Sequence, residues 1–246
     1  MTKNQTYILV AGGCLLALCA VIVLVGGVLY VAPLFADQLN SGPEIVNATE
    51  NPRPSADGNS MGDPNAPIHM EEFSDFQCPF CQRFHKQTEP SLVEQYVNTG
   101  KVYFTYRSAG NWVSQNIGGG KTESQDAAAA AYCAADQNKF WEMHDILFAN
   151  LLGEDVGSFT DERLATLAEK AGLDMNTFED CYSSGKYKDK VQQDYADTIV
   201  FGVNGTPSFL VTYAVNGETK TKLIEGAQPF ESFQQELDAI LQEIGK

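Results

Sequence analysis

The sequence is short of basic side chains. Its 16 lysines and arginines stand against 32 aspartates and glutamates, which gives a formal net charge of −16 at pH 7. A protein that binds nucleic acid has to offer a cationic surface to the phosphates. The composition therefore excludes nucleic acid as a partner and indicates a well-solvated acidic surface.

The sequence also lacks the ligands of a closed metal site. Of its 6 cysteines, Cys78 and Cys81 form the one Cys-x-x-Cys pair, and the 3 histidines form no His-x-x-x-His. Zinc prefers a tetrahedral set of ligands, which usually comes from a second pair at similar spacing. We therefore predict a redox dithiol at Cys78 and Cys81, with no metal and no cofactor. A metal-binding half-site is the alternative.

Pro79, between the two cysteines, indicates how the pair is presented. Proline is favoured at the first position of a helix. Cys78 is therefore expected at the helix N-cap and Cys81 inside the first turn, after a strand over residues 67–74. The free N–H groups and the positive dipole end of the helix stabilise a thiolate there and lower the pKa of Cys78.

Four segments together form a more specific pattern than the cysteine pair alone. They are residues 62–67 (GDPNAP), 72–81 (EFSDFQCPFC), 137–145 (QNKFWEMHD) and 205–209 (GTPSF). This pattern resembles the DsbA-like thiol:disulfide oxidoreductases of the thioredoxin superfamily. The resemblance implies an α/β thioredoxin fold with an inserted helical subdomain. The sequence departs from well-known members at Phe80, where they have histidine, so the oxidising strength of the site does not transfer.

The first part of the sequence is uncharged from residue 7 to residue 35. A helix of that length, at about 1.5 Å per residue, exceeds the roughly 30 Å hydrocarbon core of a membrane. A cleaved signal peptide usually has an apolar region of only about 7–15 residues. Lys3 is the only cation before Arg53. We therefore expect an uncleaved single-pass anchor, with the N-terminus in the cytoplasm and the rest outside.

These patterns predict three parts in the chain. Residues 1–36 are expected to form the transmembrane anchor. Residues 37–62, rich in Pro, Asn, Ser and Gly, are expected to be a flexible linker. Residues 63–246 are expected to form the DsbA-like thioredoxin domain, with its helical insertion at about residues 122–203.

The helical insertion contains a second pair of cysteines. Cys133 and Cys181 are expected to form a structural disulfide, because two cysteines in one small subdomain usually pair in an oxidising compartment. Two buried free thiols are the alternative. His144 is predicted to be a packed core residue. His85, one helical turn past the second active-site cysteine, is predicted to lie on the surface.

Three further positions are candidate site residues. Glu72 shares a strand face with Ile68 and Met70 by the two-residue period. It is either a solvated acid on an edge strand or a buried proton acceptor whose pKa desolvation raises. The resemblance favours the second interpretation, since the family has an acidic residue six positions before its first cysteine. It also implies a cis-proline at Pro207, which would place the backbone of Thr206 beside the dithiol.

Together these features predict an extracytoplasmic enzyme that oxidises protein thiols. Cys78 is expected to be the exposed nucleophile, Cys81 to resolve the mixed disulfide and Glu72 to handle protons. Thr206 and Pro207, with Pro79 and Phe80, are expected to contact protein or peptide thiol substrates. A membrane redox partner would restore the disulfide.

Three alternatives remain open. The same site can run in reverse as a disulfide reductase or isomerase, which a reduction potential near that of thioredoxin would indicate. A chaperone for copper or zinc would bind metal through the reduced dithiol. A non-catalytic peptide-binding module would not turn the dithiol over at all.

Overall fold

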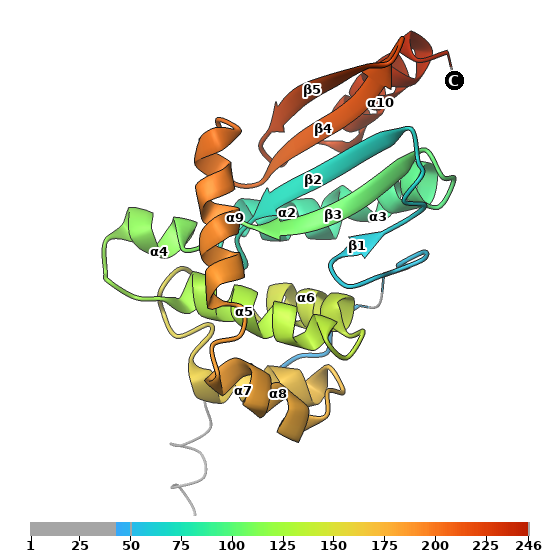
Figure 1. The fold of residues 1–246 in the computed structure, drawn as a ribbon. Helices are drawn as coiled ribbons and strands as arrows, with labels where there is room; N and C mark the ends of the chain where they lie inside the picture. The colour runs from blue at the N-terminus through green and yellow to red at the C-terminus, as the bar shows by residue number, and fades with distance from the viewer. Residues whose placement is uncertain (1–42, 50, 246) are drawn as a thin grey trace, which may run out of the picture. The chain divides into compact units, whose positions relative to one another are not determined.

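The strand that precedes the cysteine pair lies at the centre of a five-stranded sheet (Figure 1). The computed structural model describes residues 43–49 and 51–245. The strand order is β1-β3-β2-β4-β5; β2 runs parallel to β3 and antiparallel to β4, and β4 pairs with β5 as a hairpin. The strands are β1 (Ser60–Met61), β2 (Ile68–Ser74), β3 (Val102–Ser108), β4 (Ser208–Val215) and β5 (Glu218–Glu225).

Local sequence explains much of this sheet. Along β3 buried residues alternate with half-buried ones, which is the two-residue period of a strand with one face in the core. The turn between β4 and β5 is Asn216-Gly217, and both residues have a left-handed backbone, with φ of 52° and 84°. Asparagine followed by glycine favours this type of tight hairpin turn.

Helices flank the sheet and connect its strands. After the cysteine pair the first helix ends at Gln87, before Pro90, because proline removes a backbone donor and clashes with the preceding turn. The helices are α2 (Pro79–Gln87), α3 (Glu89–Leu92), the π-helical turn η1 (Val93–Val97), α4 (Trp112–Ile117), α5 (Glu123–Ala135), α6 (Phe140–Ala149), α7 (Asp161–Lys170), α8 (Met175–Ser183), α9 (Lys188–Val200) and α10 (Phe230–Glu243).

The two faces of the sheet are covered in different ways. On one face Phe84 of α2 packs on Phe209 of β4, with ring centroids 4.5 Å apart, and Phe233 of α10 lies 4.8 Å from Phe209. Such buried aromatic contacts contribute beyond their burial by about 0.5–1.5 kcal/mol per pair. On the other face Arg107 of β3 donates to Asp194 of α9 at 2.8 Å, which fixes α9 against the sheet.

The helices α4 to α9 form an insertion between β3 and β4 (Figure 1). Within it, Cys133 of α5 and Cys181 of α8 are joined by a disulfide, with their Cα atoms 5.8 Å apart. The predicted α/β fold with a helical insertion is confirmed. The insertion also brings α4, which sequence periodicity did not indicate, next to the start of α5.

The N-terminal predictions have a mixed outcome. The predicted anchor at residues 7–35 lies outside the described residues. Within residues 43–49 and 51–245 no helix is both long and apolar enough to cross a membrane. The linker predicted over residues 37–62 stays a prediction; the compact unit of the structure begins at Val46 and includes β1. Val46 is held by both its N–H and its carbonyl to the side chain of Asn150, at 2.8 and 3.0 Å.

Candidate active site

One buried carboxylate shapes the turn between β2 and α2. The side chain of Asp75 accepts hydrogen bonds from the N–H of Gln77 at 2.8 Å and of Val113 at 2.9 Å, and its carbonyl accepts from the N–H of Cys78 at 3.0 Å. Burial raises the pKa of Asp75 to about 6 despite these bonds. The turn delivers Cys78 to the N-cap of α2 with Pro79 at the start of the helix, as predicted.

Cys78 has the environment of a stabilised thiolate. In the thiol form its Sγ donates to the carbonyl oxygen of Thr206 at 3.3 Å, and the Thr206–Pro207 peptide bond is cis. The pKa of Cys78 is lowered to about 7, and the hydrogen bond from the Cys81 thiol is the largest cause. The side chain of Thr206 and the N–H groups of Phe80 and Cys81 lower the pKa further, and together these bonds outweigh the opposing effect of burial. Stabilisation of the anion at a helix N-terminus makes the thiolate accessible near neutral pH.

The expected exposure of the nucleophile is not what the structure shows. Cys78 is only 4% exposed and Cys81 is fully buried, because the loop of Thr206 and Pro207 covers the first turn of α2. Phe80, between the two cysteines, is instead the exposed side chain, at 54%. The structure therefore brings the predicted substrate-contact residues to the dithiol and leaves Phe80 as the apolar surface beside it.

Cys81 and Glu72 form the buried half of the site. Burial raises the pKa of Cys81 well above its usual value, and the neighbouring Cys78 and Glu72 add to this. Burial also raises the pKa of Glu72 well above its usual value. Glu72 is 2% exposed because β2 lies between β3 and β4, so the solvated edge-strand interpretation is wrong. The two groups are suited to hold or exchange a proton out of contact with water.

A buried polar network at Gln77 was not found by sequence reasoning. The Gln77 amide donates to Ser114 and Ser124, both at 2.9 Å, and to Asp155 at 3.1 Å, and its oxygen accepts the N–H of Asp155 at 2.6 Å. It connects the active-site turn with α4, α5 and the loop between α6 and α7. The only signal in the sequence is a glutamine directly before Cys78, which does not indicate its distant partners.

A second polar cluster lies beneath α2, and it corrects the prediction for His85. His85 is 7% exposed rather than on the surface, because α6 covers it. Atoms of His85, His144 and Asp145 that could bind a metal lie within 4.8 Å of one another. The guanidinium of Arg53, a cation of the chain itself, donates to Asp145 at 2.5 Å. One of these three candidate ligands, Asp145, is therefore already paired with a cation of the chain itself.

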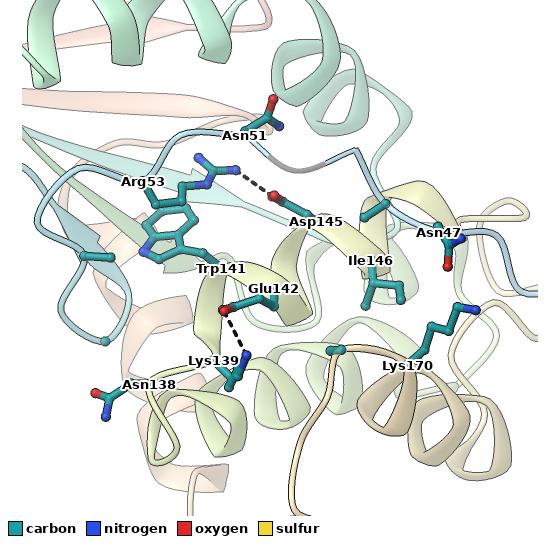
Figure 2. Close-up of a pocket in the computed structure, with 14 residues that line it drawn as sticks. Asn47, Asn51, Arg53, Asn138, Lys139, Trp141, Glu142, Asp145, Ile146 and Lys170 are labelled. Carbon is teal, nitrogen blue, oxygen red and sulfur yellow. Dashed lines mark hydrogen bonds and ion pairs between the residues drawn. The ribbon is translucent and has the colours of Figure 1, made fainter.

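Arg53 and Asp145 of this cluster also line a pocket that does not include the dithiol (Figure 2). It has a volume of about 750 Å³. Figure 2 shows Arg53 beside the Trp141 ring, with its guanidinium directed at Asp145. Neither Cys78 nor Cys81 lines it. The pocket therefore does not identify the reactive centre, which is identified by its thiols.

Comparison with known sequences gives relatives of two kinds. The family described as thioredoxin matches residues 55–239. The chain is 25% identical over 194 residues to the probable disulfide bond formation protein D of Bacillus anthracis, covering 78% of this chain and 82% of that protein. It is 32% identical over 150 residues to the Na(+)/H(+) antiporter NhaA 3 of Salinispora tropica, covering 61% of this chain. The chain spans only 21% of the length of that antiporter.

Solved structures share the fold. BdbD from Bacillus subtilis superposes with a TM-score of 0.62 at 18% identity, covering 80% of this chain and 100% of that one. Wolbachia pipientis alpha-DsbA1 also has a TM-score of 0.62, at 22% identity, covering 76% of this chain and 90% of that one. The sheet and its helical insertion are therefore those of DsbA-type structures.

Proposed function

This chain belongs to the thioredoxin family, in its DsbA-like branch, and on that premise we propose that it is a protein thiol:disulfide oxidoreductase that oxidises protein thiols. One observation supports the proposal above the others. Cys78 lies at a helix N-terminus with its pKa lowered to about 7, one turn from a buried cysteine whose pKa is raised. This asymmetry gives the two sulfurs different roles.

The reaction begins with the oxidised Cys78–Cys81 bond. A substrate thiolate attacks the sulfur of Cys78; the new substrate–Cys78 bond forms, the Cys78–Cys81 bond breaks, and Cys81 leaves as a thiolate. Cys81 takes a proton, because its raised pKa favours the thiol, and Glu72 is the adjacent group that exchanges it. A second substrate thiolate then attacks the substrate sulfur and releases the Cys78 thiolate. Two electrons pass from the substrate to the protein.

Re-oxidation of the dithiol uses Cys78, Cys81 and Glu72 again. A redox partner that accepts the two electrons restores the disulfide, and Glu72 takes the proton from Cys81 when that thiol attacks. A buried carboxylate serves this role best when its pKa lies near the working pH. Its position under the dithiol, on the central strand, supports Glu72 as the proton acceptor.

Thr206, Pro207, Pro79 and Phe80 are proposed to contact the substrate. The carbonyl of Thr206 already reaches Cys78 at 3.3 Å, so a substrate segment at this loop is brought to the reactive sulfur. An extended peptide that lies along this loop can pair with its backbone. The exposed ring of Phe80 offers an apolar contact next to it.

The direction of the reaction and the location of the protein belong to the same proposal. Stabilising the Cys78 thiolate stabilises the reduced form, which makes the disulfide the stronger oxidant. The Cys133–Cys181 disulfide supports an oxidising compartment. The uncharged run at residues 7–35 supports a single-pass anchor in the cell membrane, with the catalytic domain outside and a membrane partner that re-oxidises it.

The test is oxidation of a reduced, unfolded substrate protein that contains several cysteines. The oxidised full chain should form substrate disulfides with the loss of one Cys78–Cys81 bond per disulfide made. Cys78→Ser should be inactive, whereas replacing both Cys133 and Cys181 by alanine should leave the thiol chemistry in place. Rapid reduction of substrate disulfides without net oxidation would contradict the oxidising direction and support a reductase.

A further inference from the structure

The cluster beneath α2 is a closed arrangement of buried charge. Arg53 donates to both Glu89 and Asp145. The Nδ1 of His85 lies 2.6 Å from a carboxylate oxygen of Glu89, and the Nδ1 of His144 lies 2.9 Å from Asp145. The side chains of Arg53, Glu89 and Asp145 are 9%, 1% and 7% exposed. Arg53 is thus the cation that balances two buried carboxylates in this cluster.

The cluster joins four parts of the chain around the active-site helix. His85 is on α2, one turn past Cys81, and Glu89 is on α3. His144 and Asp145 are on α6. Arg53 comes from the segment before β1. It lies just outside residues 55–239, the part of the chain that the family matches. Removing one partner of such a buried pair leaves an uncompensated charge, so each member affects the others strongly.

The cluster packs against the strand face that contains Glu72. Glu72 pairs with Tyr106 in the ladder between β2 and β3, so their side chains are neighbours on one face. The Tyr106 ring meets the His144 ring edge to face, with centroids 5.4 Å apart. His144 in turn reaches Asp145, which binds Arg53. A continuous path of contacts therefore links Arg53 to the carboxylate under the dithiol.

The charges of the cluster act on Glu72 with opposite signs. Burial is the main cause of its raised pKa; the negative charge of Glu89 raises the pKa further, and the positive charge of Arg53 lowers it. Glu89 is itself kept ionised, since Arg53 and His85 outweigh the effect of its burial. The titratable and charged side chains around Glu72 and the cluster are Cys78, Cys81 and His85 on α2, Glu89 on α3, Tyr106 on β3, His144 and Asp145 on α6, and Arg53.

We propose that Arg53 is a positioning residue for the thiol chemistry: its guanidinium holds Glu89 and Asp145 in place, balances their buried charge, and thereby fixes the protonation of Glu72 beneath the dithiol. A segment outside the thioredoxin-family match thus controls the proton acceptor of the active site. The catalytic consequence rests on the proposed oxidoreductase function, whereas the effect on Glu72 itself does not.

The first measurement is a direct titration of Glu72 in the reduced full chain. The infrared C=O band of a buried protonated carboxylic acid reports it, and loss of that band in Glu72→Gln assigns it. Arg53→Met should keep Glu72 protonated to higher pH, with the ratio of protonated to ionised Glu72 at a fixed pH raised roughly threefold to tenfold. Glu89→Gln should shift the titration in the opposite direction. The double variant of Arg53 and Glu89 should return toward the wild-type curve.

Two further variants separate charge from packing. Arg53→Lys keeps the charge and should stay near the wild-type titration. Arg107→Gln removes another arginine with buried ion pairs, on the opposite face of the sheet, and should leave Glu72 unmoved. If Arg53→Met fails to fold, Glu89→Gln and Arg53→Lys still test the proposal. An unmoved Glu72 titration in Glu89→Gln, or in folded Arg53→Met, would overturn it.

The second measurement is the rate at which Cys81 resolves a mixed disulfide, followed against pH. In Arg53→Met the rising limb of this profile should move to higher pH by the same number of pH units as the titration of Glu72. A uniform decrease at all pH values would indicate a structural role and overturn the proposal. If the wild-type chain does not resolve mixed disulfides at all, the proposed function fails, and the infrared titration still decides the role of Arg53.

Discussion

The reduction potential of the Cys78–Cys81 couple should change its pH dependence near pH 7. Below the Cys78 pKa of about 7, reduction takes up two protons with two electrons, so the potential falls by about 59 mV per pH unit. Above it Cys78 remains a thiolate, one proton is taken up, and the slope is about 30 mV per pH unit. An ordinary thiol, with the pKa of 9.0, would place this break two units higher.

The size of the effect follows from the same shift. Lowering the pKa from 9.0 to about 7 stabilises the reduced form by about 3 kcal/mol at high pH, or about 60 mV. A depressed pKa favours the ionised thiol, so the stabilisation of the reduced form grows as the pH rises. The stabilisation is complete above the ordinary pKa and is lost as the pH falls through about 7, where less than about a fifth of it remains.

The assay equilibrates the protein with glutathione buffers across this range and quantifies the oxidised fraction by alkylation. Thiolate absorbance gives an independent titration of Cys78. Because the hydrogen bond from Cys81 is the largest cause of the shift, Cys81→Ala should raise the Cys78 pKa by about one unit or more, and Cys81→Ser, which keeps a donor, should raise it less. A single slope of about 59 mV per unit through pH 8 would refute this account.

Three further outcomes are expected. Replacing Cys133 and Cys181 by alanine should lower the free energy of unfolding in urea by up to about 4 kcal/mol, because the disulfide closes a loop of 48 residues; a loss below about 1 kcal/mol would contradict the loop-entropy reasoning. Glu72→Gln should slow resolution by Cys81 about 100-fold, measured by decay of a trapped mixed disulfide, and an unchanged rate would exclude a proton-transfer role. Phe80→His should lower the pKa of the nucleophilic thiol by adding a donor or a charge at the helix N-terminus, seen as thiolate absorbance at lower pH; an unchanged titration would show that the side chain points away.

The dithiol could be predicted from the sequence because its determinants are local. Pro79 lies next to Cys78, and a proline at the first helical position is enough to put the cysteine at the N-cap. The hairpin at Asn216-Gly217 is also determined locally, because these two residues themselves favour the left-handed backbone of a tight turn. In both cases a few consecutive residues determine the conformation, whatever packs around them.

The surroundings of the dithiol could not be predicted in this way. The partners of Arg53 are 36 and 92 residues away, and composition around Arg53 is typical of a linker. Gln77 reaches Asp155 across 78 residues. The burial of His85 depends on α6 folding back over α2. Sequence periodicity shows which face of an element is apolar, but not which distant element will cover it.

The contact between Cys78 and Thr206 has a consequence for the biosynthesis of the protein. The two residues are 128 positions apart, with the whole helical insertion between them. At about 5–20 residues per second, a ribosome needs roughly 6–26 s to extend the chain from one to the other. During that interval the nascent chain contains both active-site thiols but not the loop that covers them. Their cover is completed only when β4 has been made and inserts beside β2.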